Sequence, residues 1–157
     1  MPTQTKRFEI LVAEDSPDDV ELVRQALKEH QVDCVLHVTH DGAHAITIID
    51  SLDADPQAPP LDLLLLDMHL PRRDGKEILT RLRSSGRYAE TPVIVMTGSL
   101  SSVVEEKAAR HAPVVYFQKP SSLDEFMQFG KIIRGVLDGQ RGVPETPSNG
   151  KSLGGGV

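Results

Sequence analysis

Cysteine and long hydrophobic segments are scarce in this sequence of 157 residues. Cys34 is the only cysteine, so an internal disulfide is impossible, and its valine neighbours favour a small core residue of a strand over a redox role. No apolar run approaches the roughly 20 residues that cross a bilayer. The polar residues 1–7 are not followed by the apolar segment of a signal peptide. We therefore expect a cytoplasmic protein with no membrane association.

Positive charge is also in short supply. The net charge is −6, and no run of Lys and Arg occurs. Proteins that bind duplex DNA without sequence preference place several cationic side chains against phosphates on one face. The charge balance therefore argues against direct DNA binding.

Five short apolar runs alternate along the chain with five stretches that favour helices. The expected strands are 8–13, 34–39, 61–68, 92–97 and 114–118. The expected helices are 17–30, 42–52, 74–83, 101–111 and 122–137. Strict alternation with short connections predicts a parallel sheet with helices on both faces. Five strands favour an α/β fold of the flavodoxin-like doubly wound type, (βα)5, with strand order 2-1-3-4-5.

The composition changes near the end of the chain. From about Asp138 the sequence is rich in Gly, Pro, Ser and Thr and loses its hydrophobic period. Segments of this kind bury too little apolar surface to fold. We expect one domain at 7–138 and a disordered tail at 139–157.

Polar side chains stand where four of the expected strands end. They are Glu14 and Asp15, Asp67, Thr97, and Lys119. Ligands of a doubly wound sheet bind outside the carboxyl ends of its strands. The sequence therefore predicts one site that contains three carboxylates, a hydroxyl and an ammonium.

The carboxylates of this site predict a magnesium ion. Three carboxylates placed together repel one another unless a cation neutralises them. An all-oxygen site with few protein ligands suits Mg²⁺, which keeps several waters. We expect Asp15 and Asp67 as direct ligands, Glu14 acting through metal-bound water, and the backbone carbonyl of His69 as a further ligand.

Asp67 is the predicted nucleophile toward phosphorus, because aspartyl phosphate formation is known covalent chemistry. Phosphoryl transfer requires mainly positioning and charge neutralisation. Lys119 can pair with one phosphoryl oxygen, and the Thr97 hydroxyl or the backbone N–H groups after Asp67 can hold another.

These motifs resemble the receiver domain of two-component response regulators. Residues 67–75 look like the phosphoacceptor loop of that family, with Pro four and Gly eight residues after the aspartate. The acidic pair, Thr97-Gly98 and Lys119-Pro120 follow in the family's order, and Tyr116 stands at its aromatic switch position. The resemblance covers residues 7–137. The loop at 53–60 and the Leu-rich third strand are similar to regulators that serve bacterial phytochromes.

The resemblance implies a function and partners. A sensor histidine kinase, of the phytochrome type by the narrower resemblance, or a phosphotransfer protein would phosphorylate Asp67 in an Mg²⁺-dependent reaction. Thr97 would then move toward the phosphate, and Tyr116 would turn inward. Output would pass to a downstream protein through the fourth helix, fifth strand and fifth helix. The chain would be a signalling protein of a phosphorelay and not an enzyme. It would catalyse only its own phosphoryl transfer and autodephosphorylation.

The sequence departs from the family pattern at a few positions. Ser16-Pro17-Asp18-Asp19 follow the acidic pair, and His69 and Ser99 occupy the positions that tune dephosphorylation in the family. Two hydrophobic stripes mark the last helix, the first through Phe126 and Ile133 and the second through Phe129, Ile132 and Val136. The second stripe is either a docking or homodimer surface or part of a wide core-facing stripe.

Three other functions fit the sequence less well than that of a receiver. A phosphatase of the haloacid dehalogenase type has a second acid where His69 stands. A flavin carrier would place phosphate beside Glu14 and Asp15, which would repel it, and aromatic residues are only 4% of the chain. A degenerate receiver that serves as a scaffold would not need the complete acidic set.

Overall fold

The computed structural model describes residues 7–98 and 114–140. The expected helix 101–111, with His111, lies outside the described residues, as do Ser99 and residues 141–157. The strands are β1 (Phe8–Ala13), β2 (Cys34–Thr39), β3 (Leu63–Asp67), β4 (Val93–Thr97) and β5 (Val114–Gln118). The helices are α1 (Pro17–Glu29), α2 (Gly42–Ala54), α3 (Gly75–Arg83), α5 (Leu123–Met127) and α6 (Phe129–Gln140).

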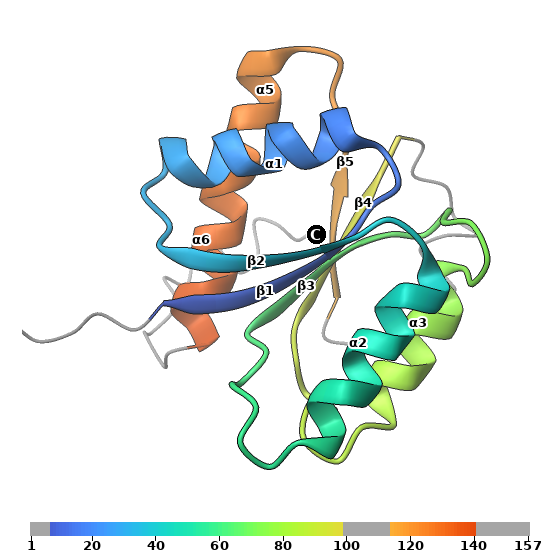
Figure 1. The fold of residues 1–157 in the computed structure, drawn as a ribbon. Helices are drawn as coiled ribbons and strands as arrows, with labels where there is room; N and C mark the ends of the chain where they lie inside the picture. The colour runs from blue at the N-terminus through green and yellow to red at the C-terminus, as the bar shows by residue number, and fades with distance from the viewer. Residues whose placement is uncertain (1–6, 99–113, 141–157) are drawn as a thin grey trace, which may run out of the picture.

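The five strands form one parallel sheet in the order β2-β1-β3-β4-β5, as the sequence predicts. Helices α1, α5 and α6 cover one face, and α2 and α3 cover the other (Figure 1). The fold is therefore flavodoxin-like. It brings the carboxyl ends of β1, β3, β4 and β5 to one edge.

The sheet separates two hydrophobic cores, because side chains alternate between its faces. In the central strand β3, Leu63 and Leu65 enter the core beneath α1, α5 and α6. Leu64 and Leu66 enter the core beneath α2 and α3. All four side chains are fully buried. This two-sided burial explains why β3 is a continuous run of leucines.

Helices α1 and α2 begin where predicted, whereas several other element boundaries differ slightly. Ser16 caps α1 by accepting a hydrogen bond from the Asp19 amide, and Asp41 caps α2 in the same way. Asp74 lies outside α3 and forms a reciprocal capping box with Glu77. Strand β3 is shorter than expected at both ends, and α2 continues to Ala54.

The prediction of one last helix at 122–137 was wrong. Two helices replace it, separated at Gln128, and α6 continues to Gln140, into the expected tail. The Nε2 atom of His30, at the end of α1, donates to the Met127 carbonyl at 3.0 Å, while the Lys131 amide bonds to Gln128 instead. A side chain that binds a carbonyl within a helix interrupts its i to i−4 ladder, which accounts for the break.

The second stripe of the last helix is mostly part of the core. Phe129 is fully buried and stacks on Phe117, with ring centroids 4.0 Å apart. Ile132 and Val136 are half-buried against the same core. The wide core-facing stripe is therefore the correct interpretation for Phe129, and less apolar surface is left for docking than expected.

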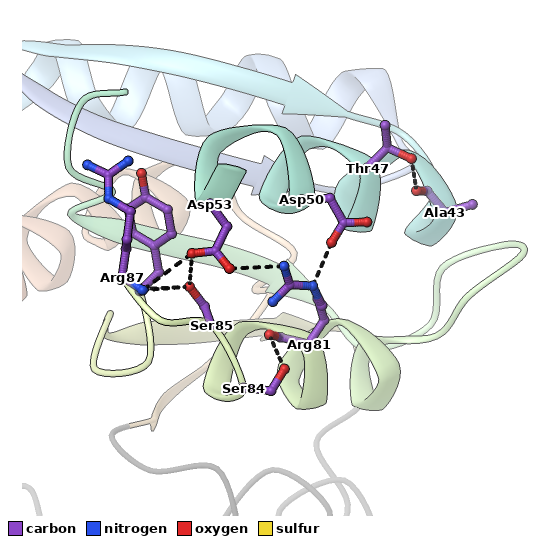
Figure 2. A network of polar contacts seen from close by, with 9 residues as sticks. Ala43, Thr47, Asp50, Asp53, Arg81, Ser84, Ser85 and Arg87 are labelled. Carbon is purple, nitrogen blue, oxygen red and sulfur yellow. Dashed lines mark hydrogen bonds and ion pairs between the residues drawn. The ribbon is translucent and has the colours of Figure 1, made fainter. Parts of the chain in front are cut away.

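A polar network joins α2, α3 and the loop that follows each of them (Figure 2). The Arg81 guanidinium donates to Asp50 at 2.6 Å and to Asp53 at 3.1 Å. Arg87 donates to three backbone carbonyls at the end of α2 and in the loop beyond it, those of Leu52, Asp55 and Ala58. The hydrogen bond from Ser85, and then that from Arg81, lower the pKa of Asp53. This network holds α3 against α2 and orders the loop before β3.

Within the two described segments, no helix has the length and apolar character needed to cross a membrane.

Candidate functional site

The predicted site residues lie at the carboxyl edge of the sheet. The Glu14 amide donates to the Thr39 carbonyl at 3.0 Å, so the backbone pairing of β1 with β2 extends one residue beyond β1. The Lys119 amide donates to the Thr97 carbonyl at 2.7 Å and extends β5 in the same manner. Glu14 and Lys119 are thus positioned by the sheet backbone and not by flexible loops.

Glu14, Asp15 and Asp67 form a compact acidic cluster. One carboxylate oxygen from each lies within 4.8 Å of the others. Glu14 is fully buried and Asp67 nearly so, whereas Asp15 is exposed. The donors are all oxygen, and the exposed side of the cluster leaves room for water, so the set suits a hard divalent cation such as Mg²⁺.

Lys119 supplies the positive charge beside this cluster. Its Nζ atom lies 2.7 Å from Glu14 Oε1 and 3.6 Å from Asp67 Oδ2. A third carboxylate, that of Asp19, is 2.8 Å from the same atom. The first and third contacts are full hydrogen bonds, and the contact with Asp67 is electrostatic only.

The site raises the pKa values of both Glu14 and Lys119, for different reasons. Burial raises the pKa of Glu14 to about 7, against the opposing hydrogen bond and charge of Lys119, and Asp67 adds to the increase. Burial alone would lower the pKa of Lys119, but its hydrogen bonds with Asp19 and Glu14 outweigh burial and raise the pKa. Neighbouring carboxylates thus strengthen the hold of Lys119 on its proton, whereas Glu14 holds its proton mainly because burial disfavours the charged form.

The loop after β3 forms the immediate surroundings of Asp67. The His69 amide donates to Asp67 Oδ1 at 2.9 Å, so backbone N–H groups do face the acceptor. Gly75 begins α3 against this loop, and a Cβ atom there would lie 2.6 Å from the Met68 sulfur. Only glycine permits this approach. An open cavity of about 410 Å³ lies beside this loop and is lined by Asp15, Met68, His69, Leu70, Pro71, Asp74 and Lys76.

Thr97 and Tyr116 lie on the same face of neighbouring strands. Tyr116 pairs in register with Val95, two residues before Thr97. Thr97 is almost fully buried, and Tyr116 is half-buried against the core beneath α2 and α3. Because side chains alternate with a period of two, both side chains point to that core, which is the geometry a coupled movement requires.

The sequence prediction located these residues but missed Asp19. The acidic cluster and Lys119 come together as expected, Thr97 contacts Lys119 through its backbone carbonyl, and His69 lines the cavity beside Asp15. Metal ligation by the His69 carbonyl remains a prediction. In the sequence, Asp19 stands out only as part of a departure from the family pattern. An acid in the first turn of a helix is common, since it interacts favourably with the helix dipole, and this hid its contact with Lys119.

Comparisons with known proteins agree on one family. The profile of the family described as "Response regulator receiver domain" matches residues 10–130. Response regulator Rcp1 of Synechocystis sp. is 34% identical over 90 residues, which are 57% of this chain and 61% of Rcp1. The chain covers smaller shares of the next curated relatives, 44% of TrcR and 12% of TmoS.

Solved structures give the same result. The Mn²⁺-bound form of Rcp1 superposes with a TM-score of 0.70 at 26% identity, covering 89% of this chain and 99% of that one. The phosphorylated cyanobacterial phytochrome response regulator RcpA has a TM-score of 0.73 at 24% identity, with 90% and 99% covered. At this identity, the likeness to RcpA shows a shared fold and nothing more.

Proposed function

Because this chain belongs to the response regulator receiver domain family, we propose that it accepts a phosphoryl group on Asp67 from a sensor histidine kinase. We take residues 7–138 as the receiver domain. One observation carries the proposal: Asp67 lies in a cluster of three carboxylates, with the Lys119 ammonium 3.6 Å from its Oδ2 atom. That arrangement suits a divalent cation and a phosphoryl group on the same carboxylate.

Each residue has a proposed role. Asp15 and Asp67 would hold Mg²⁺ directly, Glu14 would act through metal-bound water, and the His69 carbonyl would complete the protein ligands. When bound, Mg²⁺ neutralises charge on the phosphoryl oxygens. A carboxylate oxygen of Asp67 attacks the phosphorus of a phosphohistidine, and the P–N bond breaks as the new P–O bond forms. The leaving imidazole takes a proton from solvent.

The remaining groups stabilise the product. Lys119 donates to one phosphoryl oxygen, and the Thr97 hydroxyl with the His69 amide donates to the others. Thr97 moves toward the phosphate, and Tyr116 follows into the space that it leaves. This is a local change of charge that biases a two-state element. Later attack by water on the phosphorus releases phosphate and restores the carboxylate.

Beryllofluoride, which stands in for a phosphoryl group on a carboxylate, tests the acceptor. It would be added with Mg²⁺ to the wild type and to Asp67→Asn, and amide NMR shifts would be followed. We expect shifts at Thr97, Tyr116 and Lys119 in the wild type alone. A wild type that stays unchanged would overturn the proposal and favour a degenerate receiver that acts as a scaffold.

We further propose that the partner kinase is of the phytochrome type, which the likeness to the bacteriophytochrome response regulator RtBRR, at 27% identity and a TM-score of 0.67, supports. Phosphotransfer from a phytochrome kinase should then be faster than from kinases of other sensor classes at equal concentration. Equal rates would contradict the phytochrome assignment but would not affect the proposal that Asp67 accepts the phosphoryl group.

The signalling surface is proposed to comprise β5, α5, α6 and residues 101–111. Val115 and Leu123 are exposed large hydrophobic side chains in β5 and α5. Either a downstream protein or a second copy would cover them. Light scattering with beryllofluoride and Mg²⁺ separates these cases, since a mass that stays monomeric rejects the homodimer.

A further inference from the structure

Lys119 is held by an acid that the acceptor chemistry does not require. Its ammonium donates to Asp19 Oδ2 at 2.8 Å, nearly as short as its 2.7 Å bond to Glu14 and far shorter than its 3.6 Å contact with Asp67. Asp19 belongs to the first turn of α1, and Lys119 directly follows β5. The contact therefore joins the start of α1 to the residue that should bind the phosphoryl group.

The contact closes a ring of hydrogen bonds. The Ser16 amide donates to Glu14 Oε2 at 3.1 Å, and the Asp19 amide donates to Ser16 Oγ at 3.2 Å. Lys119 completes the ring by donating to the carboxylates of Asp19 and Glu14. The N-terminal cap of α1 is thus part of the same ring of hydrogen bonds as the Lys119 ammonium.

This ring of hydrogen bonds competes with the phosphoryl group for Lys119. An ammonium has three donors, and Asp19 and Glu14 occupy two of them. The phosphoryl group brings additional negative charge to Asp67 and needs Lys119 as a hydrogen-bond donor. The Asp19 carboxylate opposes this both by holding the ammonium and by repelling the new charge.

We propose that Asp19 is a positioning residue that competes with the phosphoryl group on Asp67 for Lys119. Phosphorylation draws Lys119 out of the ring, and the Ser16–Asp19 turn at the start of α1 loosens as a result. The inference rests on the proposed function, and it adds a second place, the start of α1, where the phosphorylated state differs.

The test compares Asp19→Asn with Asp18→Asn. Both variants remove one negative charge from the first turn of α1, so both lose a similar interaction with the helix dipole. Asp18 is exposed and stands outside the ring. Beryllofluoride is titrated at fixed, saturating Mg²⁺, and the apparent dissociation constant is taken from the Thr97 amide shift.

We expect Asp19→Asn to bind beryllofluoride about three- to tenfold more tightly than Asp18→Asn, as expected for removing one like charge several ångströms away in a partly buried site. In the wild type and in Asp18→Asn, the Ser16 and Asp19 amides should shift on binding. In Asp19→Asn the Ser16 shift should be much smaller, because Lys119 is already less firmly held.

The outcomes separate the two proposals. Equal or weaker binding by Asp19→Asn, with a responsive wild type, would overturn the inference and leave the acceptor function standing. Ser16 and Asp19 amides that do not move in the wild type would overturn it without any variant. A wild type that does not respond at Thr97 would reject the acceptor function and this inference with it.

Discussion

Glu14 should make the metal-free protein less stable as the pH rises toward 8. Its carboxyl is fully buried, and burial raises its pKa to about 7 from the ordinary 4.5. At pH values between 4.5 and 7, the Glu14 carboxyl of the folded state binds a proton that the unfolded state has released. The stabilisation is complete below pH 4.5 and is lost as the pH rises through 7.

The size of the effect follows from the two pKa values. Between pH 6 and pH 8, linkage for one such group lowers the free energy of unfolding by about 1 kcal/mol. For a domain of this size that corresponds to a melting temperature about 4 °C lower. Excess Mg²⁺ should cancel most of the loss, because the cation neutralises the carboxylate.

Thermal unfolding would be measured at both pH values in chelator and again in excess Mg²⁺, for the wild type and for Glu14→Gln. The glutamine variant keeps the shape of the side chain and cannot titrate. All other titrating groups, including the histidines, are common to both proteins, so the difference between their pH effects isolates Glu14. If the two proteins lose the same stability in chelator, the buried-carboxylate reasoning is wrong.

Three other predictions concern packing, the loop network and the switch. A Cβ atom at Gly130 would overlap the Ala26 carbonyl on α1, whereas one at Gly135 would meet open space. Chemical denaturation should therefore show Gly130→Ala destabilised by about 1–3 kcal/mol and Gly135→Ala stabilised by about 0.5–1 kcal/mol. Arg87→Lys should speed amide hydrogen exchange in the loop at 53–60, because an ammonium cannot reach three carbonyls, and should leave beryllofluoride binding unchanged. Thr97→Ala should still bind beryllofluoride but should abolish the Tyr116 amide shift; a retained shift would remove Thr97 from the switch.

The sheet and the acidic cluster were predictable because their signals are local. Each strand is a short apolar run, and the residue that carries chemistry stands at its end. The leucine run of β3 identifies the centre of the sheet, because only a strand covered on both faces is apolar at every position. Once strand order is known, the meeting of Glu14, Asp67 and Lys119 follows from the rule that parallel strands end at one edge.

The missed features depend on partners distant in sequence. The break at Gln128 needs His30, which reaches the Met127 carbonyl from α1. No periodicity within the helix reports that contact. Asp19 is similar, since its contact with Lys119 joins segments a hundred positions apart in the chain. Its place in a first turn has a sufficient local explanation, so the sequence offers no reason to look for a second one.

The charge balance of the site connects its stability to its proposed role. Glu14, Asp19 and Asp67 lie around the Lys119 ammonium, Asp15 joins the acidic cluster, and α1 begins close by at Pro17. The partial positive charge of that helix start offsets part of the repulsion, but not a whole charge. The folded protein therefore retains an excess of negative charge that a divalent cation relieves. A phosphoryl group on Asp67 would add negative charge again, 3.6 Å from the Lys119 ammonium in the present contact. Since Lys119 is tied to α1 through Asp19, any response of the ammonium to phosphate must be shared with the start of that helix.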